Sequence, residues 1–150
     1  MTPVPRSALI LSLAGLIPFV WGAITVMHPG LADWTIATIG PRFAGPYVML
    51  FYGAVILAFM SGFLWGFATK LDGSQATMGY VLAVIPALWA FLTTGGGPDS
   101  AGLSLIAGFI GLLGLDWLFW RYGVAPVWWM QLRVLLSSII LTCLTIGVYA

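Results

Sequence analysis

The sequence predicts an all-α fold, a bundle of five transmembrane helices with a short interfacial segment in the first loop. The chain of 150 residues is 61% hydrophobic and only 6% charged, whereas a soluble domain carries about 25% charged residues. A chain with so little charge cannot cover a water-facing surface, so most of it must face lipid. It also contains five separate apolar runs of about the 20 residues that a spanning helix needs. We therefore expect a single integral membrane domain over residues 1–150.

Five spans are expected, in chain order, at about residues 7–27, 47–69, 77–94, 102–120 and 127–149. The segments between them are rich in Pro and Gly or carry charge, as is typical of loops: "HPGLADWTIATIGPRFAGP", "KLDGSQ", "GGGPDS" and "RYGVAP". The first span follows Arg6, but its apolar stretch is longer than the roughly 7–15 residues of a signal-peptide core. We therefore expect it to be a retained helix.

Two prolines and the long first loop add local detail. Pro18 and Pro86 are expected to kink the first and third spans, and each frees a backbone carbonyl that a neighbouring group must satisfy. In the first loop, "LADWTIATIGP" predicts a short interfacial helix that stops at Gly40 and Pro41. Trp34 is expected to anchor this helix at the head groups.

The basic residues predict the orientation of the spans. If the N-terminus is cytoplasmic, four basic residues fall on the inner side and one on the outer side: Arg6, Lys70, Arg121 and Arg133 against Arg42. This bias follows the positive-inside rule, which applies because all the loops are short. Most tryptophans are also expected near the two membrane boundaries, as in aromatic belts. The sequence therefore predicts a cytoplasmic N-terminus and a C-terminus on the opposite side.

One carboxylate, Asp116, lies inside a long apolar run, "GLLGLDWLFWRYG". Asp116 and Arg133 each lie about eight positions from the centre of the loop near Val124, so they should be level in an antiparallel hairpin. We expect the two side chains to form a structural ion pair, because each neutralises the cost that the other carries in the membrane. Gln131 is close enough in sequence to assist. Proton handling by Asp116 and interfacial exposure without a partner are the alternatives.

Small residues recur along two of the spans. They allow close backbone approach, which is how membrane helices associate, so they mark helix-packing faces or a face for a partner protein. Packing inside the bundle is the first expectation, and docking of another membrane protein is the alternative. The residues are Ala54, Ala58, Gly62 and Gly66 on the second span and Gly108 and Gly111 on the fourth.

Residues able to carry chemistry are few. The chain has no glutamate, no second acid shares a span with Asp116, and the net charge of +1 gives no basic field for nucleic acid. The single cysteine, Cys143, is expected to be a small core residue. The single histidine, His28, is expected to be an interfacial polar residue rather than a ligand or a titrating switch. We therefore predict no catalytic, cofactor-binding or metal-binding residue, and the sequence favours a protein that is not an enzyme.

Three stretches carry a resemblance that covers roughly residues 5–148: "PRSALILSLAGLIPFVWGA", "GPYVMLFYGAVILAFMSGFLWGFA" and "LDWLFW". The chain resembles the uncharacterised integral membrane family called domain of unknown function 3429, or transmembrane protein 69-like. The resemblance implies a five-helix protein of a proteobacterial inner (plasma) membrane. It implies no activity, substrate or site residue.

The sequence favours an integral membrane protein without an evident catalytic site. We interpret it as a scaffold, accessory or assembly factor whose partners are the lipid bilayer and another membrane protein or a second copy of itself. A small oligomeric transporter or channel is the alternative, although such a protein needs polar groups along a shared pore. A membrane enzyme acting on lipid or quinone would need a reactive cluster that the sequence lacks.

Overall fold

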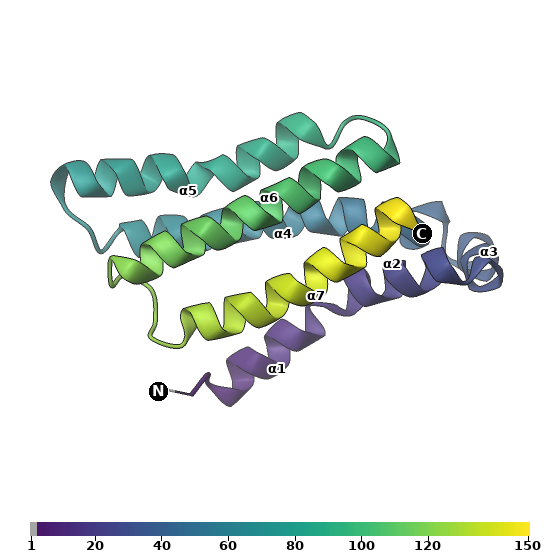
Figure 1. The fold of residues 1–150 in the computed structure, drawn as a ribbon, viewed down its shortest axis with the longest axis horizontal. Helices are drawn as coiled ribbons and strands as arrows, with labels where there is room; N and C mark the ends of the chain where they lie inside the picture. Colours follow the sequence, from purple (N-terminus) through teal and green to yellow (C-terminus); the bar gives the residue numbers. More distant parts are fainter. Residues whose placement is uncertain (1–2) are drawn as a thin grey trace.

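The computed structural model describes residues 3–150, and in them the fold is all-helical, without strands (Figure 1). Five helical segments are long and apolar enough to cross a membrane: Arg6–Met27, Gly45–Ala68, Gly73–Thr93, Pro98–Arg121 and Trp129–Tyr149. This confirms the predicted fold class. The third and fourth segments begin four residues before the expected spans. Their first turns are polar or small, "GSQA" and "PDSA", and therefore do not read as apolar.

The first membrane segment consists of two helices, α1 (Arg6–Ala14) and α2 (Ile17–Met27). Pro18 lies at the start of α2. It has no N–H, and its ring would clash with the carbonyl four residues earlier, so α1 ends at Ala14. The Tyr52 hydroxyl donates a hydrogen bond to the Gly15 carbonyl at 2.9 Å. The expected interruption is therefore present, and a neighbouring helix satisfies a carbonyl that it frees.

The first loop folds into α3 (Pro29–Thr38) and a short 3-10 helix, η1 (Pro41–Phe43). Figure 1 shows α3 at the end of the bundle where the C-terminus lies, opposite the N-terminus. Two hydrogen bonds tie the loop to α2. Trp21 Nε1 donates to the Phe43 carbonyl at 2.8 Å, and the backbone N–H of Gly45 donates to Thr25 Oγ1 at 2.7 Å. The helix expected in this loop is therefore formed, and its Trp34 side chain is exposed.

Helix α4 (Gly45–Ala68) is the central element, since it contacts α2, α5, α6 and α7. The core around it contains side chains with no exposed surface, namely Phe19, Leu57, Leu64, Leu105 and Phe109. Phe19 meets Phe109 edge-on, with ring centroids 6.0 Å apart. One face of α4 thus holds the bundle together.

Helix α5 (Gly73–Thr93) continues through Pro86 without interruption. The backbone N–H of Ala87 donates to Ser61 Oγ of α4 at 2.9 Å, so a side chain of the neighbouring helix satisfies a backbone group at the proline. A Cβ atom built at Gly79 would lie 2.9 Å from Ala68 Cβ, which shows how closely α5 and α4 approach. Helix α4 therefore provides hydrogen-bond partners at both proline sites.

The outward surface of the bundle is strongly apolar. In the most apolar window of each membrane segment, only 22% to 39% of the residues are buried inside the protein. Large apolar side chains such as Leu11, Phe91 and Leu92 are more than two-thirds exposed. Such a surface matches lipid and not water, so the described chain is an integral membrane protein.

Candidate functional site

A single hairpin carries the one ion pair among residues 3–150. Its helices are α6 (Pro98–Arg121) and α7 (Trp129–Tyr149). Arg133 Nε donates a hydrogen bond to Asp116 Oδ2 at 2.8 Å. Both residues are buried, with Asp116 0% and Arg133 3% exposed. The structure therefore brings together the two residues that the loop length places at one depth.

A tryptophan completes this polar cluster. Trp129 Nε1 donates to Asp116 Oδ1 at 3.1 Å, so each carboxylate oxygen accepts a hydrogen bond. The Trp129 ring packs edge-on against Phe67 of α4, with centroids 5.0 Å apart. Gln131, which the sequence suggested as the assisting residue, is exposed instead. Residues four apart share a helix face, so Trp129 lies with Arg133, whereas Gln131 points away. That spacing was the signal that could have identified Trp129.

The cluster is suited to holding helices rather than to catalysis. Its charges cancel, and a carboxylate that is 0% exposed and hydrogen-bonded through both oxygens is not accessible to a substrate. Two buried polar atoms on the same face of α7, Arg133 Nη2 and Ser137 Oγ, have no hydrogen-bond partner in the described chain. The pair thus joins α6 to α7 in the interior, and removing one partner of such a buried pair is strongly destabilising.

Three of the four small residues singled out on α4 do not pack inside the bundle, and the fourth, Ala54, only borders its core. Ala54 is half-buried, but Ala58, Gly62 and Gly66 are exposed. A Cβ atom built at either glycine would meet nothing within 4 Å. We call these four residues the α4 strip. Its place in the structure contradicts the interior packing expected first, because the buried face of α4 carries other residues: Gly45, Met49, Gly53, Leu57, Met60, Ser61, Leu64 and Ala68.

The two glycines singled out on α6 lie in different surroundings. A Cβ atom at Gly108 would lie 2.9 Å from Trp89 Cδ1 and 3.0 Å from Leu57 Cδ1, so Gly108 lets side chains of α5 and α4 approach α6. Gly111 is exposed, and a Cβ atom there would meet nothing within 4 Å. Gly108 is therefore a packing position, whereas Gly111 belongs to the outer surface.

The remaining residues able to carry chemistry are isolated. In residues 3–150, no three His, Cys, Asp or Glu side chains gather where they could hold a metal ion. His28 lies at the junction of α2 and α3, and its Nδ1 is 3.1 Å from the Ile24 carbonyl oxygen. Cys143 is buried as a free thiol. The features that stand out among the described residues are therefore the buried ion pair and the outward-facing α4 strip.

Comparison with known proteins identifies the family. The model of a family described as "Protein of unknown function (DUF3429)" matches residues 4–149. Transmembrane protein 69 of Xenopus tropicalis is 36% identical to this chain over 91 residues, which are 59% of this chain and 32% of that protein. The match therefore spans about a third of the relative's length. No solved structure matches the chain. The chain belongs to the DUF3429 family of membrane proteins of unknown function.

Proposed function

We propose that this protein is a scaffold, accessory or assembly factor that binds another membrane protein through the α4 strip. The observation that carries the proposal is the outward position of Ala58, Gly62 and Gly66, which the bundle itself does not use. Without a hydrophobic driving force in lipid, helices associate where small residues let their backbones come close. The occupant of the α4 strip is thus a transmembrane helix of the partner.

Aromatic side chains on both sides of the α4 strip support this proposal. On a helix with 3.6 residues per turn, Trp65 lies on one side of the strip and Phe59 and Phe63 on the other. The rings of Phe59 and Phe63 meet edge-on with centroids 5.1 Å apart, and Trp65 lies 4.4 Å from the ring of Tyr80 on α5. These contacts restrain the rings, so a partner helix would meet a pre-arranged surface with a small-residue centre.

The protein's place in the cell is part of the proposal. Arg6, Lys70 and Arg121 lie at one end of the bundle, at the starts or ends of membrane segments, and Arg42 lies at the other end. The positive-inside rule then favours a cytoplasmic N-terminus and a periplasmic C-terminus in a bacterial inner membrane. The relative named above is eukaryotic, so the bacterial membrane rests on the sequence resemblance and not on this relative.

A leucine at Gly62 tests the proposal. The substitution fills the centre of the α4 strip without a clash inside the chain, because a Cβ atom there meets nothing within 4 Å. We expect Gly62→Leu to keep the helical circular dichroism and melting temperature of the wild type and to lose the membrane protein that co-purifies with it in mild detergent. Gly114→Leu is the matched control, since Gly114 is also exposed and free of neighbours.

Three outcomes would contradict the proposal. One is a wild-type protein that is monomeric and alone after native extraction. Another is a Gly62→Leu variant that retains its partner, because the α4 strip would then face lipid only. A loss of thermal stability in Gly62→Leu would also count against it, since it would assign the α4 strip to the fold.

A second candidate, the small oligomeric transporter or channel, has one observation in its favour. The outward face of α7 carries an exposed polar row at heptad spacing, interrupted only by Leu135: Gln131, Ser138, Thr142, Thr145 and Tyr149. The three hydroxyls inside the span each donate to the carbonyl four residues earlier, and their oxygens can still accept a bond from another helix.

Cross-linking separates the second candidate from the first. Cys143 is replaced by alanine, Thr142 is replaced by cysteine, and oxidation is carried out in native membranes. A self-associated pore lined by α7 predicts an efficient disulfide-linked dimer, and Phe91→Cys on the exposed face of α5 is the control. Absence of a dimer at Thr142 would exclude a homo-oligomer built on this face.

A further inference from the structure

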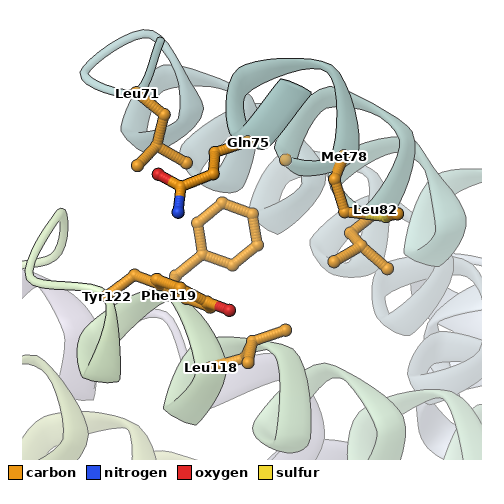
Figure 2. A pocket seen from close by; sticks show the side chains of 8 residues that line it. Leu71, Gln75, Met78, Leu82, Leu118, Phe119 and Tyr122 are labelled. Carbon is orange, nitrogen blue, oxygen red and sulfur yellow. The ribbon is translucent and has the colours of Figure 1, made fainter. Parts of the chain in front are cut away.

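Two cavities follow one another along the seam between α5 and α6. The first has a volume of about 110 Å³ and is lined by Gln75, Met78 and Leu82 of α5 and by Leu118 and Tyr122 of α6, among others (Figure 2). The second has a volume of about 270 Å³ and reaches Ile85 and Trp89 on α5 and Gly108, Gly111 and Leu115 on α6. Leu82 and Ile85, like Leu115 and Leu118, are three apart on one helix face, so the two cavities lie one after the other along the same faces of α5 and α6.

The shape of this seam fits an acyl chain. From Gln75 to Trp89 it runs along α5 for about 21 Å, at 1.5 Å per residue, which exceeds the roughly 15 Å of one leaflet of the hydrocarbon core. Gly111 of α6 keeps the seam open, because it has no side chain to fill the second cavity.

One end of the seam is polar, and two basic residues adjoin its lining in sequence. Figure 2 shows the Gln75 carboxamide directed into the space between the helices, with Tyr122 across from it. Lys70 lies one residue before Leu71 of the lining, and Arg121 lies one residue before Tyr122. The Arg121 guanidinium stacks over the ring of Trp117, 5.3 Å from its centroid, so it reaches a head group only by leaving that ring. Lys70 Nζ donates one bond, to the Val124 carbonyl at 3.1 Å, and an ammonium group has two further donors.

The same end of the bundle carries three basic residues, Arg6, Lys70 and Arg121, and one acid, Asp72. The other end carries one basic residue, Arg42, and two acids, Asp33 and Asp99. The buried pair of Asp116 and Arg133 is left out of this count. A net positive charge beside an apolar seam is complementary to an anionic head group attached to an acyl chain. We propose that the α5–α6 seam binds one anionic phospholipid, with an acyl chain along the seam and the head group at Gln75 and Tyr122, between Lys70 and Arg121. This site is separate from the α4 strip.

The wild-type protein provides the first test. The whole chain is purified in a mild neutral detergent, and phosphatidylglycerol or phosphatidylcholine with identical acyl chains is added before native mass spectrometry. We expect one tightly bound phosphatidylglycerol, at least fivefold preferred over phosphatidylcholine. Equal binding of the two lipids, or retention of an isoprenoid instead of a phospholipid, would overturn the proposal.

Paired variants test each part of the site. Arg121→Gln is expected to weaken phosphatidylglycerol binding about fivefold, since one basic residue near an anionic lipid contributes about 1 kcal/mol. Arg42→Gln, at the opposite end, is expected to leave binding unchanged. Gly111→Leu fills the second cavity and is expected to abolish the bound lipid, whereas Gly114→Leu, which is exposed but lies outside both cavities, retains it.

The controls make the variants decisive. If Arg42→Gln weakens phosphatidylglycerol binding as much as Arg121→Gln does, the effect comes from the net charge of the protein, and the head-group assignment is wrong. Lipid binding that survives in Gly111→Leu would overturn the seam. If Gly111→Leu fails to fold by circular dichroism, the lipid preference of the wild type and the pair of arginine variants still decide the matter.

Discussion

Breaking the ion pair between Asp116 and Arg133 gives the sharpest prediction about the fold. Asp116→Asn keeps an oxygen that can accept the Trp129 N–H, but it leaves the Arg133 guanidinium without a counter-charge at 3% exposure. Removing one partner of a buried pair destabilises by about 3–5 kcal/mol. We expect a loss of this size for Asp116→Asn and a similar loss for Arg133→Gln.

The double variant shows whether the two residues stabilise the protein as a pair or independently of each other. Asp116→Asn/Arg133→Gln places two neutral amides where the ions were, and these can hydrogen-bond to each other across the hairpin. We expect the double variant to be more stable than the sum of the two losses predicts, by at least about 2 kcal/mol, because residues in direct contact couple. Arg121→Gln is the control, since Arg121 is exposed and its guanidinium only stacks over Trp117 at 5.3 Å.

The assay is equilibrium unfolding of the purified chain by SDS in mixed micelles, followed by circular dichroism. Arg121→Gln should fall within about 0.5 kcal/mol of the wild type, as for most surface substitutions. Strictly additive losses in the double variant would refute the pairing, because the two side chains would then act independently. A loss in Arg121→Gln as large as that in Arg133→Gln would show that any arginine on this hairpin matters, and would refute it as well.

Three further predictions follow from individual contacts and from the charge pattern. Ser61→Ala should cost about 0.6–1.7 kcal/mol in SDS unfolding, because it removes the acceptor of the Ala87 N–H beside Pro86. Ser137→Ala should be neutral or stabilising in the same assay, because its buried hydroxyl has no partner in residues 3–150. Reporter fusions should give a cytoplasmic signal after Lys70 and a periplasmic signal after Ala150, and a cytoplasmic signal at Ala150 would contradict five spans with the N-terminus inside.

The elements and the buried pair were accessible from the sequence for simple reasons. Hydrophobic length alone predicts membrane spans, so all five segments could be placed to within a few residues. The short loop around Val124 fixes the register of the last hairpin, so the depth of Asp116 relative to Arg133 follows from counting residues. No alignment or side-chain geometry is needed for either step.

The packing face of α4 could not be predicted in the same way. In lipid both faces of a helix are apolar, so hydrophobicity does not distinguish inside from outside. Small residues also occur on both faces of α4. Gly53 and Ala68 contact Leu105 and Gly79 in the core, whereas Gly62 faces outward. The every-four-residue repeat drew attention to the outward set, because the inward small residues lie about two turns apart with Met or Leu between them.

The hydrogen bonds of the interior side chains join helices to one another, whereas both proposed binding sites lie on the outer surface. Tyr52 gives the clearest test of that division. Tyr52→Phe keeps the ring that meets Phe19 at 5.3 Å and removes only the hydroxyl that donates to the Gly15 carbonyl between α1 and α2. The variant should lose about 0.6–1.7 kcal/mol of stability, measured by SDS unfolding, while it captures the partner and binds phosphatidylglycerol as the wild type does. Wild-type stability together with lost partner or lipid binding would refute the division, because an interior hydroxyl would then act in recognition.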